Sequence, residues 1–165
     1  MTAANLEVLF LESLCKMYYA EQRIAKALPK MHAAAQSTDL QAAFQAHLDE
    51  TIVQIDRLEE VFELMGQQAL AQTCPVTDAL IYEGDQAIAA YQGSAVIDAA
   101  LIAAAQGVEH HEIARYGSLC SWSVLLGMED ESDLLNQSLT EELATDDALN
   151  ELADTAINEA ALHAS

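Results

Sequence analysis

Residues 101–119 combine the apolar pattern of a buried helix face with two glutamates on that same face. The residues that recur at this spacing are Leu101, Ile102, Ala105, Glu109, Glu112, Tyr116 and Leu119. Residues three or four apart share one face of a helix, so Glu109 and Glu112 point where apolar side chains pack. A buried ionised carboxylate is costly unless it is paired or bound to a metal. The fold must therefore supply partners for both glutamates.

The composition of the whole chain also favours helices. Its 165 residues are 52% hydrophobic and include only two prolines and six glycines, the two residue types that disfavour helix interiors. The chain has no obvious linker, so we expect a single domain over residues 1–165. The sequence thus predicts an all-α protein with a full apolar core.

Apolar periodicity divides the chain into four long helices and a short one. The predicted ranges are 5–35, 38–66, 78–90, 94–126 and a last helix from a cap at Asp130 or Ser132 to about Ile157. Asn5 is the expected N-cap of the first helix, and a capping box at Thr38–Gln41 is expected to begin the second. Gly66 and Gly127 are placed to end helices. Pro29 should kink the first helix or loosen its last turns.

The short helix, residues 78–90, is expected to pack across the bundle. It would carry the chain from the second long helix back to a third that runs in the same direction. This connection is the one that a ferritin-type four-helix bundle requires.

The charge of the chain excludes some partners. The net charge is −21, from 27 acidic and 6 basic residues, whereas nucleic acids and anionic membranes bind cationic surfaces. We therefore expect neither as a partner. The three cysteines form no C-x-x-C motif, which fits a reducing compartment. With no secretory signal and no apolar run long enough to cross a bilayer, we expect a cytoplasmic protein.

Each of the four long helices carries acids at the middle of its apolar stripe. They are Glu21, Glu50, Glu109, Glu112, Glu142 and Asp146. In a bundle these carboxylates would converge at one level and repel one another unless cations neutralised them. Four of the six basic residues lie on the first helix, so they cannot neutralise the cluster. Two metal ions would do so. Oxygen ligands suit iron and manganese, and histidine ligands shift the preference toward zinc.

Several residues near this cluster have a second interpretation. Glu50 and Asp146 can lie at the flank of the stripe, in contact with water. His47 fits a hydrogen-bonded core histidine, or one that holds a ligand in place, better than it fits a metal ligand. His110 and His111 are expected to face outward or toward an interface.

In these same regions the chain resembles the YciF/YciE-type stress-response proteins, a branch of the ferritin-like superfamily. The segments that carry the resemblance are residues 19–22 (YAEQ), 44–51 (FQAHLDET), 98–106 (DAALIAAAQ), 108–117 (VEHHEIARYG) and 140–146 (TEELATD). The resemblance implies a four-helix bundle with an extra short helix, a homodimer, and a di-metal site in each bundle. A more distant similarity to rubrerythrin rests on the Glu109-x-x-Glu112 pair.

The chain departs from the common di-iron pattern, which has Glu-x-x-His on two helices. Val53 follows Glu50 by three residues, and Thr145 follows Glu142 by three. Gln54 is the nearest substitute on one helix, and Asp146 on the other.

The hypothesis of a ferritin-like protein with two metal ions gives each acid of the cluster a role. Glu21 and Glu142 would be terminal ligands, and Glu50 and Glu112 would bridge the two ions. Glu109 and Asp146 would complete the two ligand sets, with Gln54 or His47 as additional ligands.

Two functions from different classes are consistent with the sequence. One is a ferritin-like di-metal protein, with iron or manganese at the centre and oxidase-like or peroxidase-like chemistry in a stress response. The other is a structural or interaction protein whose metal site only stabilises the bundle. An iron-storage cage is a weaker third hypothesis, because nothing in the sequence indicates cage assembly.

Overall fold

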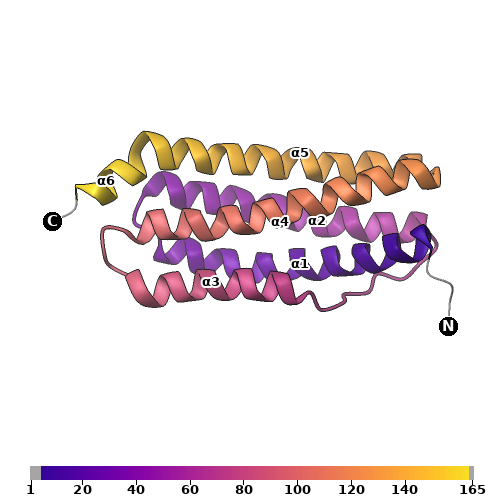
Figure 1. Ribbon diagram of the computed structural model, residues 1–165, viewed down its shortest axis with the longest axis horizontal. Helices are drawn as coiled ribbons and strands as arrows, with labels where there is room; N and C mark the ends of the chain where they lie inside the picture. Colours follow the sequence, from indigo (N-terminus) through magenta and orange to yellow (C-terminus); the bar gives the residue numbers. More distant parts are fainter. Residues whose placement is uncertain (1–4, 164–165) are drawn as a thin grey trace.

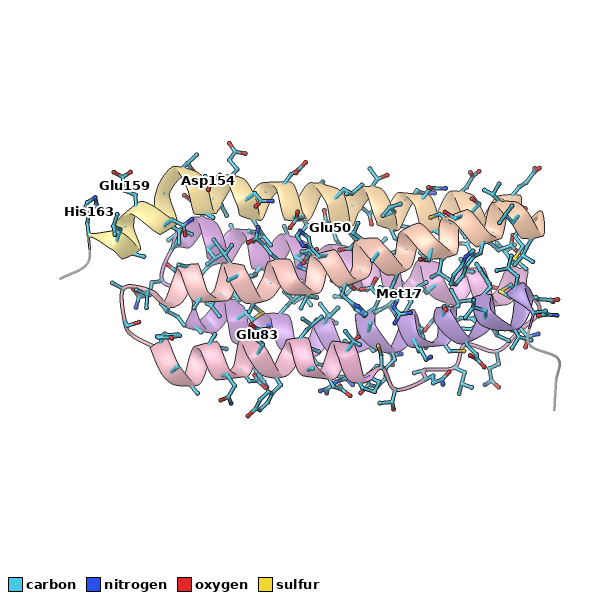
Figure 2. All side chains as sticks on the ribbon, viewed as in Figure 1. Met17, Glu50, Glu83, Asp154, Glu159 and His163 are labelled. Atoms are coloured by element: carbon cyan, nitrogen blue, oxygen red, sulfur yellow. The ribbon has the colours of Figure 1, made fainter. Side chains whose placement is uncertain are left out.

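Six α-helices and one π-helical turn make up residues 5–163, the part of the chain that the computed structural model describes (Figure 1). Their bounds are α1 Leu6–Ala34, α2 Thr38–Leu64, α3 Pro75–Tyr91, α4 Ile97–Leu126, α5 Glu129–Leu152, the π turn Ala153–Ile157 and α6 Asn158–Leu162. The all-α prediction is confirmed. The π turn and α6 continue the direction of α5 to one end of the bundle, where Figure 2 labels Asp154, Glu159 and His163.

Several helix ends form as the sequence predicts. The side-chain oxygen of Asn5 accepts a hydrogen bond from the backbone N–H of Val8 at 2.9 Å and caps α1. Gly66 and Gly127 follow α2 and α4 with φ of 65° and 72°, a left-handed conformation that glycine adopts without strain. Pro29 is exposed, and α1 continues past it to Ala34.

Three expectations about helix ends are wrong. The cap of α2 is Ser37 rather than Thr38, because the Ser37 hydroxyl accepts from the Leu40 N–H. Within the described residues no side chain caps α5, which begins at Glu129 and not after Asp130 or Ser132. The short helix α3 begins at Pro75, three residues before the predicted start, because proline suits the first position of a helix.

The long helices form a bundle in which α2 and α4 run in the same direction (Figure 1). α1 and α5 run the opposite way, and α3 brings the chain back from the end of α2 to the start of α4. The expected connection is therefore present, but α3 lies along the bundle, against α1 and α4, and does not cross it. No helix within residues 5–163 has the length and apolarity that a membrane span needs.

Apolar side chains fill the bundle on both sides of a polar middle layer. On α1, Phe10 and Leu14 precede the buried Glu21, and Leu28 follows it. On α4, Leu101 precedes the buried glutamates and Leu119 follows them. The core thus encloses the acids from both ends of the bundle.

Candidate metal centre

Four of the six predicted acids are fully buried. Glu21 on α1, Glu109 and Glu112 on α4, and Glu142 on α5 all have an exposed fraction of 0%. Their neighbours along each helix are the apolar residues of the core, so helical periodicity alone turns these carboxylates inward.

Three of these acids meet a histidine at one point in the bundle. Potential ligand atoms of His47, Glu109, Glu112 and Glu142 all lie within 4.8 Å of one another. The four side chains come from α2, α4 and α5, and His47 itself is only 4% exposed. The arrangement is therefore a compact buried set of oxygen and nitrogen atoms.

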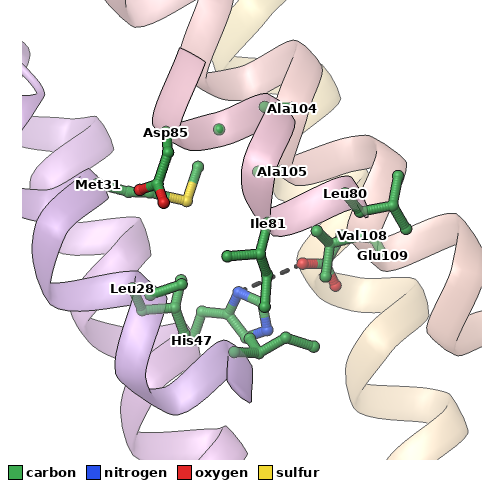
Figure 3. A pocket seen from close by; sticks show the side chains of 13 residues that line it. Leu28, Met31, His47, Leu80, Ile81, Asp85, Ala104, Ala105, Val108 and Glu109 are labelled. Carbon is green, nitrogen blue, oxygen red and sulfur yellow. Dashed lines mark ion pairs between the residues drawn. The ribbon is translucent and has the colours of Figure 1, made fainter. Parts of the chain in front are cut away.

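The polar atoms of this set have no partners among the described residues. As acceptors, both carboxylate oxygens of Glu109, Glu112 and Glu142 lack a donor there, and both ring nitrogens of His47 lack a partner. Glu109 can donate to Glu142 when it is protonated. His47 Nδ1 lies 3.3 Å from an oxygen of Glu109, but the contact does not have hydrogen-bond geometry (Figure 3). Buried polar groups are nearly always bonded, so this many unpartnered atoms in one place requires an explanation.

Burial and mutual repulsion oppose ionisation of the acids. Removal from water raises the pKa of Glu21, Glu109 and Glu112 well above the usual value, and the charge of Glu142 adds to the effect. Burial likewise raises the pKa of Glu142 to about 7. A bound cation would reverse this preference, because it stabilises the ionised form.

His47 is neutral at physiological pH. Burial lowers its pKa to about 4, so the short distance to Glu109 is not an ion pair at pH 7. A neutral imidazole has a free lone pair, which is the form that binds metals. The structure thus places His47 among the potential ligands, whereas the sequence favoured a supporting role.

Glu21 lies beside the set and is held by a tyrosine. The Tyr116 hydroxyl donates a hydrogen bond of 2.5 Å to one oxygen of Glu21. The other oxygen has no partner within residues 5–163. Burial, together with the charges of Glu21 and Glu142, raises the pKa of Tyr116 well above its usual value, so the hydroxyl remains a donor.

The other two predicted acids are half-buried. Glu50, near the mid-length of the bundle in Figure 2, accepts a hydrogen bond from the Thr145 hydroxyl at 3.2 Å. One oxygen of Asp146 lies 3.2 Å from His110 Nε2, and the other is buried without a partner in the described residues. The compact set does not include either acid.

A partly buried ion pair between an arginine and a glutamate near the site was not anticipated. Arg57 of α2 donates two hydrogen bonds to Glu141 of α5, at 2.8 and 2.9 Å, and a third to Ser138. The buried Gln54 also donates to Glu141, while its side-chain oxygen has no partner in residues 5–163. The sequence does carry a signal: Gln54 and Arg57 are three residues apart, and Glu141 adjoins Glu142. This pairing engages Arg57 with Glu141 instead of the central carboxylates.

The two other predicted histidines differ in exposure. His110 is 67% exposed, as expected, and contacts Asp146. His111 is half-buried, with its Nε2 3.4 Å from the Thr77 hydroxyl and 3.9 Å from the Cys74 thiol. His111 therefore lies against the start of α3 and is not fully turned outward, and its expected place at an interface stays a prediction.

The residues present fit a metal ion. Unpartnered, fully buried carboxylates and a neutral histidine provide hard oxygen donors and one nitrogen donor, a set that suits iron, manganese or zinc. Arg57 is engaged with Glu141, and two other basic residues form surface pairs, Arg23 with Asp78 and Lys30 with Asp85. The buried His/Glu cluster could therefore hold a metal.

The fold and the site define an all-helical bundle protein with a buried acid–histidine cluster at its centre. A family model described as "Domain of unknown function (DUF892)" matches residues 5–162. The chain belongs to this family.

Relatives with known structures confirm the predicted resemblance. The chain is 39% identical to protein YciF of Escherichia coli strain K12 over 162 residues, which cover 98% of both sequences. The crystal structure of this E. coli stress protein superposes with a TM-score of 0.90 and covers 95% of this chain and 99% of that one. YcfI of Rhodopseudomonas palustris, described as a candidate structural protein, is 44% identical, with a TM-score of 0.87 and coverage of 90% and 95%.

Proposed function

We propose that this protein binds metal at the centre of its bundle. The observation that carries the proposal is the set of unpartnered buried atoms on His47, Glu109, Glu112 and Glu142. A metal ion would give each of these atoms a partner and would neutralise the carboxylates. Similarity to YciF, described as a stress protein, supports a role in a stress response.

The four residues of the compact set would hold one ion. A second ion is proposed beside Glu21, one of whose oxygens is buried without a partner in the described residues. Glu50 and Asp146, which lie outside the compact set, are further candidate ligands of the centre. Iron or manganese at such a site would supply redox chemistry with dioxygen or peroxide. The surrounding apolar residues exclude water, and Tyr116 orients Glu21 through its hydrogen bond.

A structural role is the second candidate function. It is favoured by the description of the 44% identical YcfI as a candidate structural protein. In this case the metal would only stabilise the bundle, and a surface of the protein would perform its function. The two functions differ in one property: an iron form that reacts with dioxygen or peroxide supports the first, and a colourless zinc form that is inert to peroxide supports the second.

Metal titration tests the proposal. Protein stripped with a chelator should bind about two equivalents of Fe(II) or Mn(II) per chain, and its melting temperature should rise, because a ligand that binds only the folded state stabilises it. Glu142→Gln should lower the metal content, while Glu60→Gln, at an exposed position on α2, should not. One equivalent would limit the site to the compact set. No binding at all would contradict the proposal.

We also propose that the protein is a cytoplasmic homodimer. Its three cysteines, all within the described residues, are free thiols, as in a reducing compartment. Large apolar side chains are exposed on α2 and α5, among them Ile52, Val53 and Leu143, and an interface between copies would cover such residues. Light scattering after gel filtration should give twice the mass of the chain, and a monomer mass would contradict the dimer.

A further inference from the structure

A narrow apolar pocket lies between α1, α3 and α4 and ends at the candidate metal centre. Its walls include Ile24, Leu28, Met31, Ile81, Ala104 and Val108. In Figure 3, Asp85 and Met31 lie at one end of the pocket, and His47 and Glu109 lie at the other. The Asp85 side chain is 43% exposed and pairs with Lys30, so this end faces the solvent. The pocket therefore connects the surface beneath α3 with two of the potential ligands.

Small residues bring α3 close to α4 along this pocket. Gly84 is buried on α3, and a side-chain carbon at that position would lie 4.0 Å from the Cβ of Ala104. Leu80 similarly packs against Gly107 of α4, where a Cβ would lie only 3.3 Å from it. The close approach makes α3 the outer wall of the pocket, which gives this helix a role besides the connection of α2 to α4.

The size and lining of the pocket select for a small apolar molecule. The free volume is about 20 Å³, whereas about 10–15 Å³ is enough for one water molecule. Apart from Asp85 at the mouth and the His47–Glu109 pair at the inner end, the lining is apolar. Water and hydrogen peroxide would lose hydrogen bonds on entry, because an apolar wall offers none in return. A diatomic gas loses none.

We propose that this pocket binds dioxygen and delivers it to the metal centre from the side of His47 and Glu109. The inference rests on the proposed metal binding and adds to it the substrate and its route. Dioxygen, an apolar molecule of the right size, is therefore preferred over peroxide as the oxidant that reaches the site by this path.

Xenon tests the pocket without any metal. Crystals of the metal-free protein under xenon pressure should show a xenon atom among Leu28, Ile81 and Ala104, because dry apolar cavities bind this gas. The variant Ala104→Leu should exclude it, since the added carbons occupy the free space. Ala103→Leu is the matched control, because Ala103 is an exposed neighbour on the same helix. Absence of xenon from the wild-type pocket would overturn the proposal.

Nitric oxide tests the route to the metal. This gas has the size and low polarity of dioxygen and binds Fe(II) without turnover, so stopped-flow absorbance gives its rate of entry. In Fe(II)-loaded protein, Ala104→Leu should slow nitric oxide binding at least tenfold with unchanged iron content, while Ala103→Leu should leave the rate as in the wild type. If Ala104→Leu does not fold, Ala27→Leu narrows the pocket from α1.

The outcomes separate the two proposals. An unchanged nitric oxide rate in a variant that excludes xenon would overturn the route but leave metal binding intact. Failure of the wild type to bind iron would overturn the proposed function and, with it, delivery to a metal. In that event xenon occupancy would still decide whether the pocket takes an apolar gas.

Discussion

Glu112 is fully buried, and neither of its carboxylate oxygens has a partner among the described residues. Burial and the charge of Glu142 raise its pKa, so the metal-free protein must keep it protonated or tolerate an isolated charge. The same carboxylate would become a stabilising ligand once a cation is bound. Glu112 thus opposes folding in one state of the protein and supports it in the other.

The variant Glu112→Gln should separate these two states. In metal-free protein at pH 8, Glu112→Gln should increase the free energy of unfolding by about 1–3 kcal/mol, because glutamine cannot ionise in the unfolded chain and one unit of raised pKa is worth about 1.4 kcal/mol. In the metal-loaded protein the melting temperature should instead fall, because at least tenfold weaker binding is worth about 1.4 kcal/mol. Calorimetry measures the change in stability without metal and the change in melting temperature with metal, with Glu60→Gln as the control. The same sign of change in both states would contradict a ligand role.

At the residue scale, the sequence predicted the buried acids well and the flanking ones less well. Glu21, Glu109, Glu112 and Glu142 occupy positions that helical periodicity alone turns inward. Glu50 lies at the margin of its stripe, where a small rotation of the helix decides between a fully buried and a half-buried side chain. The assignment of His47 needed the position of α2 across the bundle from α4, which no local pattern contains.

The Arg57–Glu141 pair joins two elements, α2 and α5, beside the centre. Arg57 is 11% exposed and binds Glu141 through two parallel hydrogen bonds, a geometry that lysine cannot reproduce. Arg57→Lys should therefore reduce the free energy of unfolding by about 1–2 kcal/mol, as for the loss of a charged hydrogen bond. Arg23→Lys, which weakens the exposed pair with Asp78, should cost less than about 1 kcal/mol. Urea denaturation measures both losses, and equal losses would contradict a larger contribution from the Arg57–Glu141 pair.

The start of α2 provides a test of a single helix end. Ser37→Ala should reduce the free energy of unfolding by about 1 kcal/mol, because the Leu40 N–H loses its partner. Thr38→Ala should have almost no effect, since Thr38 already lies inside the helix. Chemical denaturation measures both free energies of unfolding. A larger loss for Thr38→Ala than for Ser37→Ala would show that Thr38 is the cap, as expected from the sequence.

At the element scale, long apolar stripes define the helices, but neighbouring residues decide where they begin. Ser37 and Thr38 are both good N-cap residues, so the backbone conformation of the turn after α1 decides which of them caps α2. The expected crossing helix lies along the bundle, because Gly84 and Gly107 let it pack closely against α4. That approach is a tertiary contact and leaves no periodic signature in α3.

The stability of the whole molecule should depend on pH in opposite ways with and without metal. The glutamates of the centre have a raised pKa in the folded state, so the stability they contribute is present below about pH 4.5 and is lost as the pH rises through the folded pKa, which is about 7 for Glu142. His47 acts in the opposite direction, because its lowered pKa costs stability as the pH falls from 6.5 toward 4. Metal-free protein should therefore lose stability from pH 6 to pH 8.

Metal binding should reverse this trend. Ligands bind as ionised carboxylates and neutral histidine, so the rise in melting temperature on metal addition should be larger at pH 8 than at pH 5. Thermal unfolding across this range, with and without a chelator, measures the two curves. Curves that stay parallel would show that the titrating acids are not the ligands. In the metal-free Glu112→Gln variant, stability should fall less steeply between pH 6 and pH 8 than in the wild type. This difference would show that the pH dependence arises from the acids of the centre.

The position of a bound metal tests the central claim most directly. A crystal of protein loaded with Fe(II) or Mn(II), measured at the absorption edge of that metal, should give an anomalous peak among His47, Glu109, Glu112 and Glu142, with a second peak on the side of Glu21. The contrary result is a metal-loaded crystal with no peak at the bundle centre, which would leave the buried acids as a protonated cluster without a cation.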